Sequence, residues 1–371
     1  MIDWTIIGKS GRAAAKESRF DASRQLWPWP SGRPNMPGLT VYARVDGSFS
    51  VWDPARNYWH RQAKSEPEAP RRPDAFHFSP DELWEGLQYE GKTVCNGLVR
   101  DWVSWQLQDD GTPGSAFQML TRALAQLSPR HEPIRPGRPM RLSVEDVRDY
   151  PTIDMPYGNI PVVHASAGMK RVLGLAYLIV WTWHEHVQAS EILGQPRDSR
   201  FVLLVDEVET HLHPLWQRRI VRSLIEVVDG LAQETSVQAL LTTHSPLVLA
   251  SLEPFFDEAR DALFLFELQG EAVQLRQLPW AKQGDANDWL TSEIFGLEQP
   301  RSLEAERAVE AAEAFMRKEM QALPEGLSSM EEIDAELQRL LPEQDPFWPR
   351  WVVTREGGGR RGSLHSRRRA R

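Results

Sequence analysis

The chain has 371 residues, of which 41% are hydrophobic and 26% are charged, as in a globular protein with one large or two ordinary domains. Its formal net charge of −9 argues against a protein that binds nucleic acid through a wholly basic surface, although a local basic patch stays open. The single cysteine, Cys95, excludes an internal disulfide framework and a cysteine-rich zinc site. No apolar run approaches the ~20 residues of a membrane-spanning helix, and the first residues have no secretory pattern. We therefore expect a cytoplasmic protein with no membrane partner.

Residues 1–79 are predicted to form a partial N-terminal lobe. The first 40 residues are rich in proline, glycine and tryptophan, which is typical of loops. Two apolar runs over 39–45 and 49–52 flank Asp46-Gly47, and this pattern predicts an antiparallel hairpin.

Residues 80–150 are predicted to form a helical insert. Ser79 followed by Pro80 and two acids has the pattern of a capped helix start. Apolar residues recur at helical spacing over 96–107 and again over 116–127. A basic, proline-rich connector over 130–139 follows.

Residues 151–280 are predicted to form the core of the fold. A short strand over 157–163 leads into an apolar helix over 169–186, which we expect to be buried. Two buried strands over 201–205 and 237–241 flank an amphipathic helix over 214–229, and this order predicts a parallel β-α-β unit. A hairpin over 263–278 follows. Residues 281–356 are predicted to contain exposed, charge-rich helices over 302–320 and 328–341, and residues 357–371 a disordered basic tail.

The strand over 201–205 ends on two carboxylates, Asp206 and Glu207. Open α/β sheets bind their ligands at the carboxyl ends of their strands. In such a place Asp206 could hold Mg²⁺, directly or through water, and Glu207 could polarise an attacking water. A strand that simply ends in solvated acids is the competing interpretation.

Two further elements point to the same chemistry. The strand over 237–241 ends in Thr242-Thr243-His244, and adjacent parallel strands bring their ends to one sheet edge, so His244 could reach a phosphate near Glu207. Ser166-Ala167-Gly168 stands at the start of the long helix, where free N–H groups can hold an anion.

In this order the elements resemble the second half of an ABC-type ATPase head, as in the heads of structural-maintenance-of-chromosomes proteins and the overcoming-lysogenization-defect and Septu-type bacterial defence ATPases. The run from Val202 to Glu207 resembles the Walker B motif, Glu209 to Pro214 the D-loop, and Thr242 to Pro246 the switch-histidine loop. Ser166 and Gly168 match the serine and glycine of the signature motif. The resemblance covers about 155–280.

The resemblance implies an α/β fold of P-loop NTPase, ABC-head type, with a parallel sheet, flanking helices, an antiparallel β-hairpin subdomain and a helical insert. It implies ATP and Mg²⁺ as cofactors, a dimer or higher oligomer of heads, and a bacterial anti-phage or DNA-surveillance role with an effector such as a nuclease, with DNA as a further candidate partner. The implied site residues are Glu207 and His244 for catalysis, Asp206 for the metal, and Ser166, Gly168, Lys170 and His211 for the nucleotide.

The chain departs from the family at the phosphate-binding loop, whose pattern is G-x-x-x-x-G-K-[ST]. Gly8-Lys9-Ser10 has the last three letters but no glycine five positions before Gly8, so we expect this loop to be missing. Three explanations stay open: a late start codon, a separate polypeptide that supplies the loop, or degenerate ATP binding. ATP hydrolysis is expected only where the loop is supplied from elsewhere.

Two other interpretations remain. One is a structural or regulatory subunit that kept the fold without hydrolysing ATP. The other is a metal hydrolase, because His211, His213 and His244 with Asp206 are suitable metal ligands. His184 and His186 are expected at the surface, near the carboxyl end of their helix.

Overall fold

The chain divides after Pro254 into two units, Met1–Pro254 and Phe255–Arg371. The computed structural model describes residues 2–7, 13–19, 21, 23, 37–57, 75–112, 114–129, 131–232 and 235–353. Gly8-Lys9-Ser10 and the basic tail over 357–371 lie outside these residues. The backbone of β1 (Ile2–Ile7) pairs antiparallel with β2 (Ala13–Ser18), so the prediction of loop structure throughout 1–40 was wrong there.

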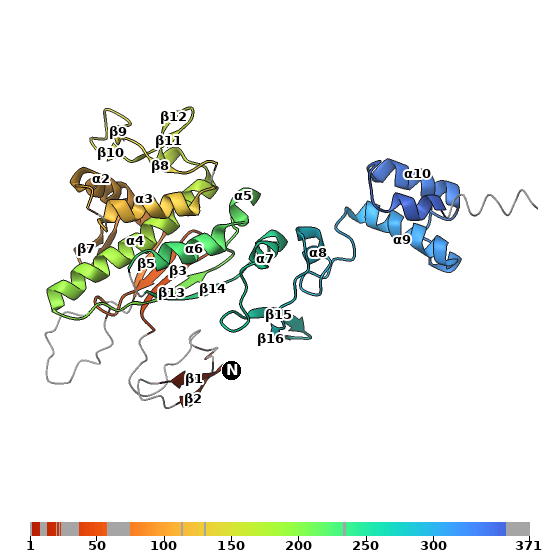
Figure 1. Ribbon diagram of the computed structural model, residues 1–371, viewed down its shortest axis with the longest axis horizontal. Coiled ribbons are helices and arrows are strands. Elements are labelled where there is room, and N and C mark those ends of the chain that lie inside the picture. The colour runs from red at the N-terminus through yellow and green to blue at the C-terminus, as the bar shows by residue number, and fades with distance from the viewer. Residues whose placement is uncertain are drawn as a thin grey trace, which may run out of the picture. The chain divides into compact units, whose positions relative to one another are not determined.

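A five-stranded mixed sheet forms the centre of the first unit (Figure 1), in the order β14 (Ser236–Leu241), β13 (Arg200–Val205), β3 (Leu39–Ala43), β4 (Phe49–Trp52) and β5 (Phe76–Phe78). β13 runs parallel to both β14 and β3, whereas β4 and β5 add antiparallel. The predicted hairpin and the predicted parallel pair are therefore confirmed. The hairpin is not a separate subdomain, because its first strand pairs directly with β13.

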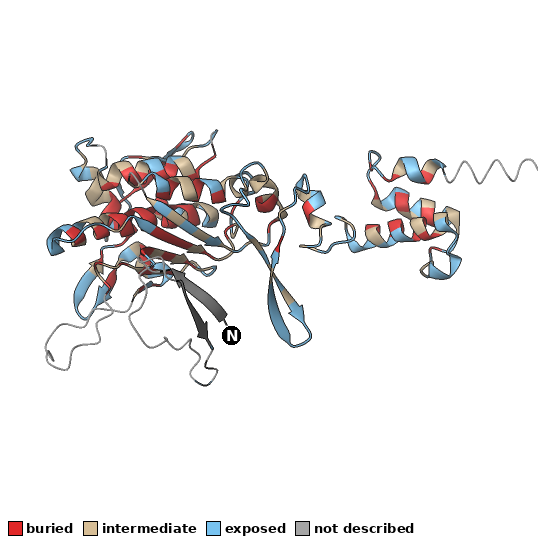
Figure 2. Ribbon diagram, turned by 60° about the horizontal axis from the view of Figure 1, so that its bottom comes forward, coloured by how far each residue is buried: buried red, intermediate tan, exposed pale blue. Residues whose placement is uncertain are grey.

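Helices pack on this sheet in two layers. α4 (Ala167–Leu193) lies against β3, α6 (Ile220–Asp229) lies against β14, and α3 (Ala116–Leu127) packs on both helices. Because α4 has the sheet on one side and α3 on the other, it is buried almost all round from Arg171 to Trp183 (Figure 2). The prediction of a buried apolar helix is confirmed, and the helix extends further at both ends than its predicted bounds.

Short strands interrupt the region that was predicted to be helical. α1 (Pro80–Glu85) has the predicted Ser79 cap, and α2 (Leu98–Gln108) and α3 follow the predicted ranges. Between and after them the structure adds several strands of two to four residues, which are too short to show a period in the sequence. They are β6 (Leu87–Tyr89), β7 (Lys92–Cys95), β8 (Arg135–Pro136), β9 (Met140–Arg141), β10 (Asp149–Tyr150) and β11 (Thr152–Met155). The next strand, β12 (Gly158–Pro161), lies within the range predicted for a short strand over 157–163 and confirms that prediction, and the 3-10 turn η1 (Val162–His164) follows it.

Three further predictions need correction. β14 is not a buried strand: in the described sheet it is an edge strand, and its residues alternate between exposed and half-buried. The helix predicted over 214–229 is two helices, α5 (Pro214–Gln217) and α6, because Arg219 leaves the helical conformation with φ −129° and reaches the carbonyl of Ser128. His186 is buried in α4, where Nδ1 lies 2.8 Å from Asp53 Oδ1.

The second unit has an apolar core of its own. α9 (Leu303–Arg317) and α10 (Met330–Leu340) pack together and are joined by a segment that includes η2 (Met320–Ala322). Ile333, Leu337 and Trp351 are fully buried there, so these helices are exposed on one side only, contrary to the prediction. The unit also contains α8 (Ala286–Leu290) and the predicted hairpin, which is β15 (Leu263–Gln269) and β16 (Ala272–Leu278). Among the described helices, none is long and apolar enough to cross a bilayer.

Candidate functional site

The acid pair follows β13 at the edge of the sheet where β14 and β3 also end. The parallel ladder continues one residue beyond β13, because the Asp206 N–H donates to the carbonyl of Ala43 over 2.9 Å. The hydroxyl of Tyr42 donates to Asp206 Oδ2 over 2.7 Å, and the hydroxyl of Thr242 lies 3.4 Å from Asp206 Oδ1. Each oxygen of Asp206 is thus oriented by a hydroxyl from a neighbouring strand end.

Glu207 has a strained backbone, with φ 43°. This region is costly for a residue other than glycine and is often found at functional sites. The Glu207 N–H donates to Thr242 Oγ1 over 2.9 Å, and Thr210 Oγ1 lies 3.2 Å from Glu207 Oε2. Thr242 therefore holds both acids, and the turn is fixed by contacts that the sequence motif does not reveal.

His244 is held at the same edge through its backbone. Its N–H donates to Glu209 Oε1 over 2.6 Å, and the hydroxyl of Thr243 donates to Glu209 Oε2 over 2.7 Å. The His244 residue is exposed. The structure thus brings Asp206, Glu207 and His244 to one sheet edge, as the resemblance implies, and leaves the imidazole accessible to a ligand.

The start of α4 meets the turn that comes after the acid pair. Ser166 is the N-cap of α4, and its hydroxyl accepts the Met169 N–H over 3.3 Å. A Cβ placed on Gly168 would lie 2.4 Å from the carbonyl oxygen of His211, so a glycine is needed for this close approach. His211 is exposed and has φ 64°, and Lys170 is half-buried in the first turn of α4. The first turn of α4 thus supplies Ser166, Gly168 and Lys170, and His211 meets it at Gly168.

Arg171 is a functional candidate that the sequence did not indicate. Its guanidinium is buried, and donates to the carbonyl oxygens of Arg44 over 2.7 Å and Asp206 over 3.4 Å. Burial lowers the pKa of Arg171 below its ordinary value, and Nε has no hydrogen-bond partner. Arg171 joins α4 to the ends of β3 and β13, and the only signal in the sequence was a cation inside an apolar helix.

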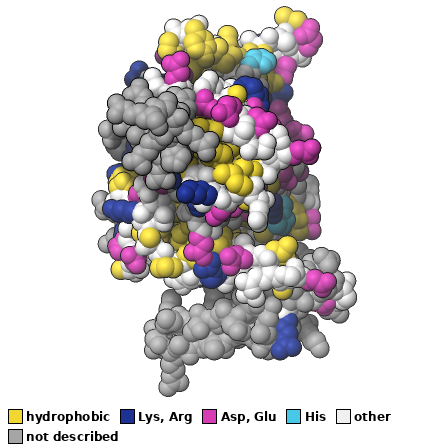
Figure 3. All heavy atoms as spheres, turned by 90° about the vertical axis from the view of Figure 1, so that its right-hand side faces the viewer, with side chains coloured by type: hydrophobic (Ala, Val, Ile, Leu, Met, Phe, Trp, Pro, Cys, Tyr) yellow, Lys and Arg dark blue, Asp and Glu magenta, His cyan; other side chains and the backbone are white. Residues whose placement is uncertain are grey.

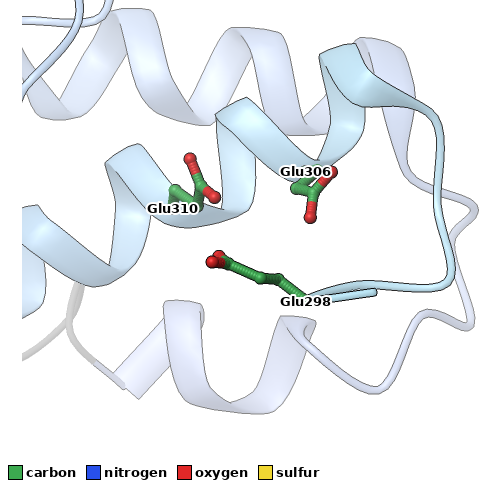
Figure 4. Close-up of side chains that lie close together, drawn as sticks. All are labelled: Glu298, Glu306 and Glu310. Atoms are coloured by element: carbon green, nitrogen blue, oxygen red, sulfur yellow. The ribbon is translucent and has the colours of Figure 1, made fainter. Parts of the chain in front are cut away.

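The metal-hydrolase interpretation does not fit the geometry. His213 is the N-cap of α5, where Nδ1 accepts the Leu215 N–H. Among the described residues, the only group of three or more His, Cys, Asp or Glu side chains with ligand atoms close together is formed by three glutamates of the second unit, Glu298, Glu306 and Glu310 (Figure 4). They lie at or near the surface, and burial, followed by the charge of Glu298, raises the pKa of Glu310.

The sequence pattern of the phosphate-binding loop does occur in the chain, at Gly86–Thr93. The expectation that the pattern is missing from the sequence was therefore wrong. The pattern forms a phosphate cradle only between a strand and a helix. Here β6 and β7 pair with each other around Glu90 and Gly91, which have φ 48° and 75°, as in a two-residue hairpin turn. Figure 1 shows β7 beside α2 and far from α5, which lies just beyond the acid pair in the chain. This hairpin is not a phosphate loop.

The donor set suits one half of a Mg²⁺–nucleotide site. Carboxylates and hydroxyls are the oxygen ligands that Mg²⁺ prefers, and Asp206, Glu207 and Thr242 supply them at one edge. An exposed histidine next to them can donate to a phosphate oxygen. The described residues do not form the successive N–H groups that would hold the β-phosphate at this edge.

Comparisons with known proteins agree with this geometry. The family model described as "AAA domain, putative AbiEii toxin, Type IV TA system" matches residues 40–250, more than half of the chain. The chain is 34% identical over 101 residues to the Septu protein PtuA of Bacillus mycoides (strain KBAB4), which is 27% of this chain and 13% of that protein. It is 32% identical over 93 residues to the Retron Vc95 probable ATPase of Vibrio cholerae serotype O1 biovar El Tor, which is 25% of this chain and 16% of that protein. The aligned segments thus span less than a fifth of either relative.

A solved structure from work on ATP-driven dimerization and DNA-stimulated activation of SMC ATPases shares 14% sequence identity, with a TM-score of 0.29, over 44% of this chain and 83% of that chain. A likeness this weak supports no conclusion about function. The family match rests instead on the segment from β3 to α7 (Pro246–Leu252), which holds the sheet, α4 and the whole candidate site. The chain belongs to the AAA-domain family described as putative AbiEii toxin of a type IV toxin–antitoxin system, and its α/β fold is that of a P-loop NTPase.

Proposed function

We propose that the chain is the ATP-binding and ATP-hydrolysing subunit of an ABC-type ATPase. The observation that carries the proposal is the convergence of Asp206, Glu207 and His244 at one sheet edge, held by Thr242 and Glu209. Acids and a histidine fixed in this way can position the reactants of phosphoryl transfer without covalent chemistry.

Each residue has a role in this proposal. Asp206 holds Mg²⁺, which would neutralise charge on the phosphates. Glu207 orients the attacking water with the oxygen that is not bonded to Thr210, and His244 donates to the terminal phosphate. Ser166, Gly168, Lys170 and His211 face the nucleotide of a second copy.

The edge of β14 that no described strand pairs with is the place where a phosphate-binding loop would complete the site. β14 pairs with β13 on one side, and Leu240 is 50% exposed. An apolar edge strand with no charged or proline residue is an open template for a further strand. A strand that added parallel to β14 would end beside His244, and the loop after it would enter the site. We propose that a separate polypeptide supplies this strand and loop.

A regulatory subunit that does not hydrolyse ATP is the second candidate. The observation in its favour is that no described segment forms a phosphate loop. Against it stand the two hydrogen bonds to Asp206, because a scaffold has no need for two hydroxyls oriented on a half-buried carboxylate at this edge.

A nucleotide-binding assay distinguishes both candidates from a protein that binds no nucleotide. The test measures binding of a fluorescent ATP analogue to the full chain, expressed together with the genes that flank it, with and without Mg²⁺. We expect saturable binding in which Asp206→Asn weakens the Mg²⁺ dependence about tenfold or more. No binding in any of these preparations would contradict the nucleotide site.

We further propose a second copy of the chain and an effector such as a nuclease as partners, acting in bacterial defence in the cytoplasm. DNA is the least supported partner. Figure 3 shows acidic and basic side chains mixed with apolar ones, with no extended basic patch among the described residues of that face. Pull-down of the intact complex and a salt-dependent DNA-binding assay would identify which partners are present.

A further inference from the structure

Glu209 binds the loop after β14 with both oxygens of its carboxylate. Oε1 accepts the backbone N–H of His244 over 2.6 Å, and Oε2 accepts the hydroxyl of Thr243 over 2.7 Å. Glu209 lies 35 residues before His244 in the chain and belongs to the turn after the acid pair. We call this pair of hydrogen bonds the Glu209 clamp.

The Glu209 clamp favours a carboxylate. Two donors, one N–H and one O–H, converge on it, and an ionised carboxyl group presents only acceptors to them. A glutamine at this position could accept the His244 N–H with its amide oxygen and donate its NH₂ to Thr243 Oγ1, but both bonds would then be neutral ones. Hydrogen bonds to a charged acceptor are also shorter and stronger than those to a neutral one.

Residues that follow His244 in the chain reinforce the Glu209 clamp. The Ser245 N–H donates to Thr243 Oγ1 over 3.0 Å, and the Ser245 hydroxyl lies 2.7 Å from Gln217 Oε1. Gln217 in turn donates to the carbonyl of Leu212 over 2.9 Å. The loop with His244 is thereby tied to both ends of the turn over 209–212.

The same turn is also the surface on which α4 begins. Gly168 lies so close to the carbonyl of His211 that even a methyl group would not fit. Glu209 links this turn directly to the backbone of His244, and the contacts of Gln217 with Ser245 and Leu212 link the turn to the residue after it. A shift of the turn relative to α4 would therefore move the backbone of His244.

We propose that Glu209 is a positioning residue that couples the turn over 207–213, and through it the start of α4, to the backbone of His244. This inference rests on the proposed function, because Glu209 affects catalysis only if His244, the residue that it positions, acts on the nucleotide. A partner head that contacts His211 or Ser166 would then set the place of His244 through this clamp.

Amide hydrogen exchange in the nucleotide-free full chain tests the clamp without any need for ATPase activity. In Glu209→Gln the His244 amide is expected to exchange about tenfold faster, because the acceptor of its hydrogen bond loses its charge. The Thr242 amide, which donates to Val205 in the ladder, keeps its protection. Glu207→Gln is the matched control: it makes the same change two residues away, where the carboxylate contacts Thr210 and not the loop. It should leave the His244 amide unchanged.

Unchanged protection of His244 in Glu209→Gln would overturn the clamp. Equal loss of protection at His244 and along β13 and β14 would overturn the positioning role as well, since it would show only general destabilisation. The effect of Glu209 on catalysis is measured separately, in the preparation that hydrolyses ATP. There Glu209→Gln should lower kcat about tenfold with little change in KM, whereas a raised KM at constant kcat would contradict it. Failure of ATP turnover in the wild-type protein would reject the proposed function while the exchange result still decides the clamp.

Discussion

The hydroxyl of Tyr42 donates a 2.7 Å hydrogen bond to Oδ2 of Asp206, although the two residues are 164 positions apart in the chain. They meet because β3 pairs parallel with β13, with Tyr42 opposite Leu204. The hydrogen bond to Asp206, followed by burial, raises the pKa of Tyr42 above its ordinary value. Tyr42 therefore stays a donor and sets the direction in which Asp206 presents its other oxygen.

Tyr42→Phe should lower the free energy of unfolding by about 1 kcal/mol at pH 7, because one hydrogen bond is lost and the ring is kept. Since the folded-state pKa is raised, this contribution is present below the ordinary tyrosine pKa near 10 and is lost as the pH rises through the higher folded-state value. Urea unfolding at pH 7 and above pH 10 measures both effects. Tyr157→Phe, at a residue 75% exposed, is the control and should change neither. A Tyr42→Phe effect that stayed constant across this range would contradict the assignment.

Gly168→Ala should destabilise the first unit by about 1–2 kcal/mol. Alanine favours a helix over glycine by about 1 kcal/mol, but its Cβ would lie 2.4 Å from the backbone of His211, where nothing flexible can yield. Thermal unfolding compares it with Gly174→Ala in the same helix. There the nearest atom is the end of the Leu83 side chain, at 3.0 Å, which can move aside. Equal effects of the two substitutions would contradict the close approach of α4 to the turn.

The place of the candidate site could be predicted from the sequence because its motifs are local. An apolar run that ends in Asp206-Glu207, and another that ends before His244, each predict a strand with polar residues at its carboxyl end. The groups that hold these residues come from other strands and turns: Tyr42, Thr242 and Glu209 contact them only after the sheet has formed. No local pattern predicts such contacts, because they depend on strand register.

Three of the predictions were wrong for identifiable physical reasons. β14 was predicted as a buried strand from its apolar residues, although Gln238 in its middle already indicated the alternation of a half-exposed one. The break between α5 and α6 left no trace in the apolar period. It falls at Arg219, whose guanidinium donates to the carbonyl of Ser128, and no local pattern predicts this contact between distant residues. At Gly86–Thr93 the adjacent Glu90-Gly91 pair was the sequence signal for a hairpin instead of a phosphate loop.

Cys95 should be almost inert in the folded protein. Burial raises the pKa of its thiol to about 12, and its sulfur lies 3.0 Å from the hydroxyl of Tyr177. Because the thiolate is the reactive form, labelling with a thiol reagent at pH 8 should be at least about a hundredfold slower in the native than in the unfolded protein. As the only cysteine, Cys95 then reports unfolding at a single position. Comparable labelling rates in the two states would contradict its burial.

Glu310→Gln should slightly stabilise the second unit at pH 7. The pKa of Glu310 is raised in the folded state, so the folded protein holds its proton more tightly than the unfolded one. Stability therefore falls as the pH rises through the interval between the ordinary and the raised pKa, and it stays lower above that interval. Removing the charge should recover only a few tenths of a kcal/mol, because solvent screens exposed carboxylates. Thermal unfolding at pH 4 and pH 7 measures this difference, and a stabilisation that is as large at pH 4 would contradict it.

The decisive experiment for the proposed site is the rate of Mg²⁺-dependent ATP hydrolysis by the wild-type protein and by Glu207→Gln, each purified with the chains encoded beside it. We expect measurable turnover in the wild-type preparation. In Glu207→Gln we expect turnover at least about a hundredfold lower, with nucleotide binding retained, because the attacking water loses its orienting carboxylate. Equal rates in the two preparations would show that the ATPase activity comes from another protein, and the sheet edge with Asp206, Glu207 and His244 would not be its site.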